Sequence, residues 1–300
     1  MVGNVMDGRG VAQQIKEKIR EQLKVAKDSH VNPNLVTILV GNNLASKTYV
    51  KNKHSACSEV GMDSRNVELG GNTSQLELER TIEELNSDTT VTGILLQLPL
   101  PTGLNDSRAI SMISKEKDVD GLNPCNLGLL VQKDAKIAPC TPKGVMVLLR
   151  HYGVSMAGRH VVVVNRTRLV GRPLTQLLLN EDATVTVCHS KTQSLADVTR
   201  QADILITGIG RRSEFTVGPD MIKPGATVVD IGTSSVDGKL MGDVNFEEAL
   251  KVASLVSPVP GGVGPMTIAM LLYNTLLTAC MQKGLELKLT PSELSAPVPS

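Results

Sequence analysis

The sequence predicts an α/β fold with two domains. Strand-like runs of Val, Ile and Leu alternate with segments of helical length along most of the chain. These runs show little alternation of polar and apolar residues, which is typical of parallel strands buried on both faces. A length of 300 residues is also sufficient for two domains of ordinary size.

The first half of the chain supplies the elements of one predicted domain, residues 1–152. Apolar runs predict buried strands at 34–40 and 91–96. Segments with helical features are expected to form helices at 10–26, 46–60, 77–85 and 145–151. The stretch 118–141 is rich in loop formers, and we place the domain boundary near Gly153.

The second half predicts a Rossmann-like, doubly wound parallel sheet over residues 153–264. Strands are expected at 160–164, 183–188, 203–207, 226–232 and 254–259, with helices at 171–179 and 194–200. A last apolar helix, at about 265–283, is expected to complete the first domain. Residues 285–300 are rich in Pro and Ser near their end and are expected to form a flexible tail.

Composition excludes several classes of protein. A formal net charge of +1 argues against a broad charged surface for nucleic acid or an anionic membrane. Only five aromatic residues are present, too few for stacked recognition of single-stranded nucleic acid. The five cysteines form no C-x-x-C pair, and the histidines have no metal-ligand spacing, so we expect reduced thiols and no metal. The absence of an apolar signal or Arg-rich leader predicts a cytoplasmic protein.

A candidate nucleotide site follows the strand at 160–164. A strand, a tight turn and a helix N-terminus form the arrangement that receives a pyrophosphate, and VVVVNRTRLVGRP has this order. Asn165 stands where a first glycine is expected, and Asn tolerates a left-handed turn better than most residues. Taken alone, the pattern also fits an ordinary strand–helix connection.

The end of the next strand favours NADP over NAD. An NAD site usually carries an acidic residue about 20 residues after the turn, to bind the ribose hydroxyls. Here His189, Ser190 and Lys191 follow the strand, and together with Arg166 they suit a 2′-phosphate. The alternative is a solvated loop with an incidental lysine.

A third loop, PVPGGVGPMT at 258–267, precedes the last apolar helix. Its glycines allow a backbone to approach a flat ligand, and a helix N-terminus follows. The alternative is a crossover turn between domains, although so dense a Gly/Pro loop is unusual as mere linkage.

Three further positions are candidates for a substrate site. Tyr49 and Lys53 are four residues apart and share one helix face; the alternative is that Tyr49 packs in the core while Lys53 extends to solvent. Gln97 follows an apolar strand, where catalytic groups of α/β folds often lie. Asp120 precedes a glycine, and its alternative role is that of a turn-forming residue.

Taken together, these segments resemble the bifunctional methylenetetrahydrofolate dehydrogenase/cyclohydrolase family. The resemblance extends from about residue 7 to residue 281 and follows the family's order. It rests on the motifs YVKNK, GILLQLPLP, EKDVDGLNP, PCTPKG, RTRLVGRP, TVCHSKT, KPGATVVDIG, GDV and PVPGGVGPMT. Nine ordered motifs are far more specific than any one of them.

The resemblance implies two α/β domains around a cleft and a homodimer. It implies oxidation of 5,10-methylene-tetrahydrofolate with NADP, followed by hydrolysis of the methenyl product to 10-formyl-tetrahydrofolate. The tyrosine matching Tyr49 stacks on the aminobenzoate ring, the lysine matching Lys53 acts in the chemistry, and Gln97 matches its hydrogen-bond partner. Asp120 matches the residue that binds the pterin. Pro260 and Gly261 are assigned to the same substrate by their motif.

The resemblance also assigns a cofactor set. Arg166 and Ser190 match the residues around the 2′-phosphate, and the remaining positions are Thr167, Thr233, Gly264 and Thr267. The chain departs from the family at Asn165-Arg166-Thr167, where Gly-Arg-Ser is usual. Three alternatives stay open: a dehydrogenase without cyclohydrolase activity, an amino-acid dehydrogenase of similar plan, and a nucleotide-binding regulatory domain. The presence of Lys53 argues against the first.

Overall fold

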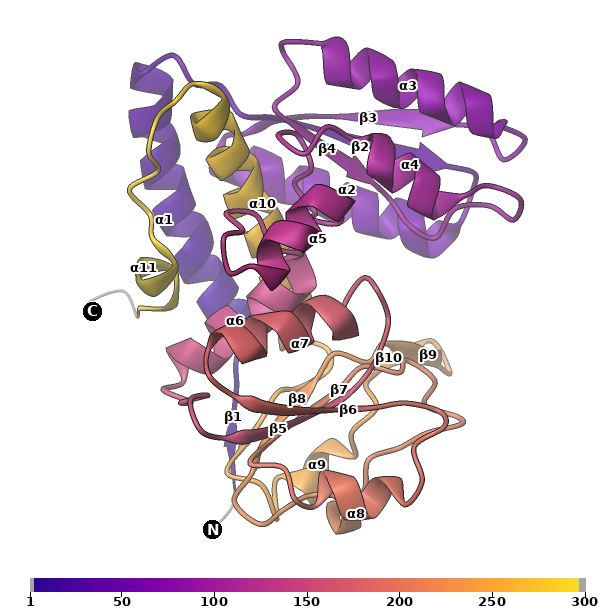
Figure 1. The fold of residues 1–300 in the computed structure, drawn as a ribbon, viewed down its shortest axis with the longest axis vertical. Helices are drawn as coiled ribbons and strands as arrows, with labels where there is room; N and C mark the ends of the chain where they lie inside the picture. The colour runs from indigo at the N-terminus through magenta and orange to yellow at the C-terminus, as the bar shows by residue number, and fades with distance from the viewer. Residues whose placement is uncertain (1–2, 297–300) are drawn as a thin grey trace. The chain divides into compact units, whose positions relative to one another are not determined.

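The computed structural model describes residues 3–296 and divides into two compact units (Figure 1). We call residues 15–140 and 268–294 the three-stranded unit. The other described residues, 3–14, 141–267 and 295–296, form the six-stranded unit. Each unit contains a parallel sheet, so the predicted two-domain α/β fold class is confirmed.

The division between the units differs from the predicted boundary near Gly153. Helix α6 (Cys140–His151) belongs, from Thr141 on, to the six-stranded unit. The start of the chain belongs there as well, because β1 (Asn4–Val5) pairs in parallel with β11 (Leu255–Val256) at the edge of that sheet. A strand of two residues is too short to produce a periodic pattern in the sequence.

The three-stranded unit contains a parallel sheet in the order β3-β2-β4. The strands are β2 (Asn34–Val40), β3 (Asp63–Leu69) and β4 (Gly93–Leu96). Its helices are α2 (Leu44–Val60), α3 (Gln75–Ser87), α4 (Asp106–Met112), α5 (Pro124–Val131) and most of α1 (Gly8–Asp28). The larger part of α10 (Val263–Gln282) joins them, as the expected completion of this unit by a C-terminal helix.

The six-stranded unit contains a parallel sheet in the order β1-β11-β8-β7-β5-β6. Its other strands are β5 (His160–Val164), β6 (Thr184–Cys188), β7 (Ile204–Thr207) and β8 (Thr227–Asp230). A small hairpin, β9 (Ser234–Val236) with β10 (Lys239–Met241), follows β8. Helix α7 (Gly171–Asn180) covers one face of the sheet, and α8 (Leu195–Thr199) and α9 (Phe246–Ala249) lie on the other (Figure 1).

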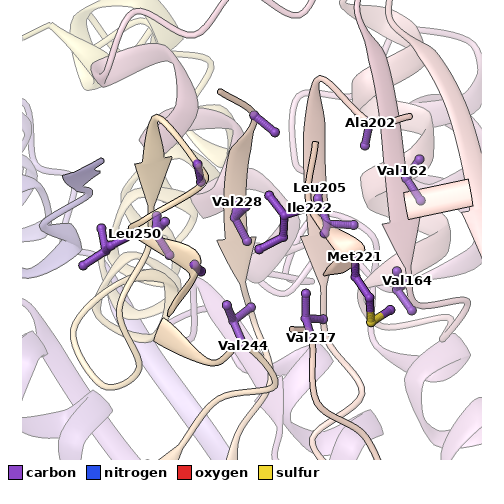
Figure 2. Close-up of a cluster of buried hydrophobic side chains, with 14 of the residues drawn as sticks. Val162, Val164, Ala202, Leu205, Val217, Met221, Ile222, Val228, Val244 and Leu250 are labelled. Atoms are coloured by element: carbon purple, nitrogen blue, oxygen red, sulfur yellow. The ribbon is translucent and has the colours of Figure 1, made fainter. Parts of the chain in front are cut away.

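The core of the six-stranded unit is built from aliphatic side chains, as the scarcity of aromatic residues requires. Figure 2 shows Val162, Leu205 and Val228, from three adjacent strands, in one layer. Leu195 of α8 and Phe246 of α9 pack against this layer. Because both faces of the sheet are covered, the central strands are buried along almost their whole length, which explains their lack of alternation in the sequence.

Several elements were not expected from the sequence. Strand β3 (DSRNVEL) is an edge strand with polar residues on both faces, so it has no apolar run. Helices α4 and α5 lie in segments rich in loop formers; each begins after an asparagine whose side chain caps it.

The segment expected to fray is partly folded. Residues 291–295 form helix α11 (Pro291–Ser295), and the side chains of Leu289 and Leu294 are buried, with 5% and 1% of their surface exposed. Lys18 Nζ donates a hydrogen bond to the carbonyl of Glu293 at 2.6 Å. Residues 297–300 of the expected tail lie outside the described residues.

Helix α10 is the one helix in the described part of the chain that is long and apolar enough to cross a membrane. However, 72% of its apolar window is buried inside the protein, as in the core helix of a globular fold. All five cysteines are free thiols, and four of them are buried.

Candidate active site

Helix α2 carries two of the predicted substrate residues. The helix begins where Asn43 accepts a hydrogen bond from the backbone of Ser46, and it ends at Gly61, whose φ of 81° only glycine adopts without strain. Tyr49 is 46% exposed, whereas Lys53, one turn later, is half-buried. This is the reverse of the alternative in which Tyr49 packs in the core and Lys53 extends to solvent.

The exposure of Tyr49 sets it apart from the other four aromatic residues. Phe215 and Phe246 pack on the core of the six-stranded unit. Tyr273 is buried and donates a hydrogen bond to the carbonyl of Leu289, and the Tyr152 hydroxyl accepts one from the backbone of Asp7. Tyr49 is therefore the aromatic residue whose ring is left accessible to a ligand, although the next residue, Val50, is buried.

Lys53 forms a hydrogen bond with Gln97, which lies just past the end of β4. Lys53 Nζ donates to Gln97 Oε1 at 2.9 Å, and Gln97 Nε2 donates to the carbonyl of Leu98 at 2.7 Å. A carbonyl only accepts, so the amide nitrogen of Gln97 must face Leu98, and its oxygen is left for Lys53. The orientation of the Gln97 amide is thus fixed by its backbone neighbour.

Burial lowers the pKa of Lys53 below its ordinary value. The carboxylate of Asp120 and the thiol of Cys140 act in the opposite direction and raise it. The balance favours the neutral amine more than in a solvated lysine. A half-buried lysine with a lowered pKa is suited to accepting a proton.

Asp120 and Asp118 have different environments although they are two residues apart. Asp118 is 2% exposed, and its carboxylate accepts hydrogen bonds from Asn123 N and Asn126 Nδ2, both at 2.8 Å. Asp118 therefore organises the turn. Burial raises the pKa of Asp120 to about 6, while Lys53 lowers it and the charge of Asp118 raises it. Asp120 lies inside this turn, because Gly121 N donates to the carbonyl of Asp118 at 3.4 Å, and its carboxylate also interacts electrostatically with Lys53.

The segment that carries Asp120 is held beside β4. Ile94 N donates to the carbonyl of Lys117 at 2.7 Å, so the segment continues the sheet and brings Asp120 toward the strand end where Gln97 lies. From α10, the fully buried Asn274 donates to the carbonyls of Val119 and Ala138 at 2.9 and 3.0 Å. The first of these bonds holds Val119, the residue directly before Asp120.

Replacing Asp120 by asparagine is expected to stabilise the ligand-free protein above pH 6. Because the folded-state pKa is raised from 3.8 to about 6, the wild type loses stability as the pH rises through this range, and the loss persists above it. At about 1.4 kcal/mol per pKa unit, Asp120→Asn should gain about 1–3 kcal/mol at pH 8 and little at pH 4. Thermal melting of both proteins across this pH range measures the difference. An equal difference at both pH values would contradict the burial of this charge.

The predicted cofactor residues of the strand loops lie on the side of the six-stranded sheet where the strands have their carboxyl ends. All strand pairs in this sheet are parallel, so their carboxyl ends share an edge. Arg166 and Thr167 follow β5, Ser190 follows β6, and Thr233 follows β8. Arg166, Ser190 and Thr233 have exposed side chains.

The segment 258–267 follows β11 at the same edge, and its residues from Val263 on form the start of α10. It begins with a tight turn in which Gly262 N donates to the carbonyl of Pro258 at 2.8 Å and Gly261 has a φ of 115°. Pro260 lies inside this turn. Gly264 is in the first turn of α10, where a Cβ would meet no protein atom within 4 Å. Thr267, one turn later, shares a hydrogen bond of 3.0 Å with Thr141.

Comparison with known proteins places the chain in a family. Residues 6–120 match the model of the tetrahydrofolate dehydrogenase/cyclohydrolase catalytic domain, and residues 139–283 match that of the NAD(P)-binding domain. The bifunctional protein FolD of Nitrosopumilus maritimus is 47% identical over 281 residues, covering 94% of this chain and 98% of that protein. The FolD of Exiguobacterium sibiricum is 49% identical over 275 residues, with coverages of 92% and 99%. The chain belongs to the tetrahydrofolate dehydrogenase/cyclohydrolase family.

Solved structures agree with this assignment. The bifunctional FolD of Campylobacter jejuni is 44% identical, with a TM-score of 0.90 over 93% of this chain and 99% of that one. The Trypanosoma brucei enzyme, solved with NADP and an inhibitor, is 40% identical, with a TM-score of 0.89 over 94% and 99%. The family predicted from nine ordered motifs is therefore confirmed.

Some features close to the predicted residues were not found from the sequence. Cys140 lies inside the quoted motif PCTPKG, but only the structure shows that it hydrogen-bonds Asp120. The loop after β7 was also missed: buried Asp243 accepts from Ile209 N at 2.6 Å and Gly210 N at 2.9 Å. The glycines at 208 and 210, directly after a predicted strand, were the available signal for this loop.

Proposed function

We propose that this family member oxidises 5,10-methylene-tetrahydrofolate with NADP and hydrolyses the methenyl product to 10-formyl-tetrahydrofolate. The observation that carries the proposal is the half-buried Lys53, bonded to an oriented Gln97, one helical turn from the exposed ring of Tyr49. Oxidation alone needs only alignment of substrate and acceptor. Hydrolysis, in contrast, needs a group that accepts a proton from the attacking water, and a lysine with a lowered pKa is such a group.

The residues of the six-stranded unit fit NADP. The turn from β5 into α7 is tight: a Cβ at Gly171 would lie 2.1 Å from the carbonyl oxygen of Asn165. Such a turn leads directly to a helix N-terminus, which suits a pyrophosphate. Arg166 and Ser190 are exposed beside it, and the loop 189–194 directly after β6 has no carboxylate to hold a free ribose hydroxyl. When bound, NADP supplies the acceptor for the hydride that leaves the methylene carbon.

Lys53 serves the hydrolysis. Its neutral amine accepts a proton from the water that attacks the methenyl carbon, which leaves a hydroxyl group on that carbon. The amine then passes this proton to the folate N5 as the bond between the carbon and N5 breaks. The hydroxyl proton is released to solvent as the formyl carbonyl forms. Gln97 holds the amine through its fixed carboxamide oxygen. Asp120 binds the pterin, and Tyr49 stacks on the aminobenzoate ring. Thr233, Gly264 and Thr267 take part on the cofactor side.

Replacing Tyr49 by alanine is expected to weaken folate binding about fivefold, because an aromatic pair contributes about 0.5–1.5 kcal/mol. An exposed ring carries little of the fold, so the melting temperature should stay unchanged. The KM for folate in both reactions measures the effect, and Tyr49→Phe is the matched control that retains the ring. An unchanged KM would remove Tyr49 from the site.

The direct test supplies the purified protein with methylene-tetrahydrofolate and either NADP or NAD. The absorbance of NADPH and that of methenyl-folate are followed together. We expect NADPH to form, and supplied methenyl-tetrahydrofolate to be consumed. Formation of NADPH without hydrolysis would indicate a monofunctional dehydrogenase, and no turnover would favour a regulatory, nucleotide-binding role for this family member.

The proposal also includes a homodimer in the cytoplasm. The homodimer rests on the family resemblance, and the cytoplasmic location rests on the relatives being FolD proteins of archaea and bacteria. Light scattering of the purified protein at micromolar concentration tests the dimer.

A further inference from the structure

The loop that follows β5 is closed by the side chain of Asn165. Its Oδ1 accepts hydrogen bonds from Thr167 N at 2.7 Å and from Thr167 Oγ1 at 2.8 Å. Its Nδ2 donates to the carbonyl of Gly208, in the loop after β7. Asn165 is not among the residues with positive φ, so the left-handed turn expected from the sequence is absent here. Asparagine acts at this position through its side chain.

The donors and acceptors of this cluster are fixed by their neighbours. The Gly208 carbonyl only accepts, so Nδ2 of Asn165 faces it and Oδ1 faces Thr167. The Thr167 hydroxyl must then donate its single proton to Oδ1. Its oxygen accepts from Val170 N at 3.3 Å and Gly171 N at 3.5 Å, where α7 begins. The hydroxyl of Thr167 is thus engaged in closing the loop.

The bond from Asn165 to Gly208 crosses the topological switch point of the sheet. Strand β5 lies between β6 and β7, and the chain runs from β5 to β6 on one side before it returns to β7 on the other. Loops that leave a sheet at such a point diverge and form the crevice where nucleotides bind. The glycine usual in the family has no side chain that could join the two loops.

Arg166 lies at the centre of this arrangement. The bond from Thr167 N to the Asn165 side chain encloses Arg166 in an Asx turn, which restricts its backbone. On the other side, Arg172 Nε donates to the carbonyl of Arg166 at 3.3 Å. The backbone of Arg166 is held from both directions while its guanidinium stays exposed.

We propose that Asn165 is a positioning residue that determines cofactor specificity by holding Arg166. The clamp restricts where the guanidinium can reach, which favours a ligand with a 2′-phosphate over one without. This proposal rests on the proposed function, since it assigns NADP to this edge of the sheet. It predicts that Asn165 affects the choice between NADP and NAD only when Arg166 is present.

A double-mutant cycle tests the proposal with the wild type, Asn165→Ala, Arg166→Ala and the double variant. The quantity measured is the preference, the Kd of NAD divided by the Kd of NADP, obtained by calorimetry on the full chain. In the Arg166 background, Asn165→Ala should lower the preference about three- to tenfold, the size expected for one or two net hydrogen bonds. In the Arg166→Ala background it should leave the preference unchanged.

The controls separate positioning from stability. Thr175→Val removes the hydrogen bond from Thr175 Oγ1 to the carbonyl of Gly171, 2.8 Å long and on the same helix α7, and should lower the melting temperature without changing the preference. Asn165→Ser retains an acceptor for the turn and should give an intermediate preference; it also serves if Asn165→Ala does not fold.

Two results would overturn the proposal: a preference unaffected by Asn165→Ala, or an equal loss with and without Arg166. If the wild type binds neither nucleotide, the proposed function itself fails, and the two failures are therefore distinguishable.

Discussion

Replacing Lys53 by methionine is expected to abolish hydrolysis of methenyl-tetrahydrofolate and to spare a measurable part of the dehydrogenase activity. A positioned general base contributes about 10²–10⁴-fold to a rate, so the loss of hydrolysis should be of that order. Oxidation needs no such base at its hydride step, although Lys53 can still help to position the substrate. Methionine keeps the length and the apolar stem of the half-buried side chain, so the fold should survive.

The two reactions must be measured separately on the folded variant. Lys51→Met is the matched control: Lys51 lies two residues earlier on α2 with an exposed side chain, and its loss should leave both activities intact. Near-normal hydrolysis by Lys53→Met would show that the lysine is structural and would remove the catalytic part of the proposal.

The pH dependence gives a second readout for Lys53. Its pKa is lowered by burial, so wild-type hydrolysis should rise with pH through a value below that of a solvated lysine. Gln97→Glu places a carboxylate at a position that now lies 2.9 Å from Nζ, which should raise the lysine pKa and move the rise to higher pH. A profile that is the same in both proteins would exclude Lys53 as the group that titrates.

The central strands and long helices could be predicted because each has a strong pattern of its own. The strand at 160–164 and the helix carrying Lys53 were recovered to within two residues at each end. Strand β3 could not be predicted, because its stability comes from seven residues paired with β2 and not from an apolar run. The loop helices α4 and α5 depend on asparagine caps at their ends, a signal that the surrounding loop formers obscure.

The candidate residues of the site could be named from the sequence, but the burial and the hydrogen-bond partners of each residue could not be predicted. The sequence could not decide whether Tyr49 or Lys53 was buried, because both lie on the same helix face. It could not separate Asp118 from Asp120, since that difference depends on Asn123 and Asn126 binding only the first. The replacement of a glycine by Asn165 suggested a backbone conformation, whereas the structure places its effect in three side-chain hydrogen bonds.

Replacing Arg166 by alanine is expected to remove most of the preference for NADP over NAD. An Arg–phosphate contact is charge-assisted and about twice as strong as a neutral hydrogen bond, so NADP binding should weaken about 10- to 100-fold. NAD has no 2′-phosphate and should lose little. Arg166 has an exposed side chain after β5, so its removal should not unfold the sheet.

The matched control is Arg159→Ala. Arg159 also has an exposed side chain, but it directly precedes β5 and so lies at the opposite end of the strand from Arg166. This variant removes the same charge from the same unit and should leave the preference unchanged. Steady-state kcat/KM for both cofactors, measured at two salt concentrations, tests the assignment. Because a contact between an exposed arginine and a phosphate is screened by salt, the wild-type preference should fall as salt rises, and that of Arg166→Ala should not. Equal losses for NADP and NAD in Arg166→Ala would mean that the arginine binds another part of the cofactor, and that the 2′-phosphate is recognised elsewhere along this sheet edge.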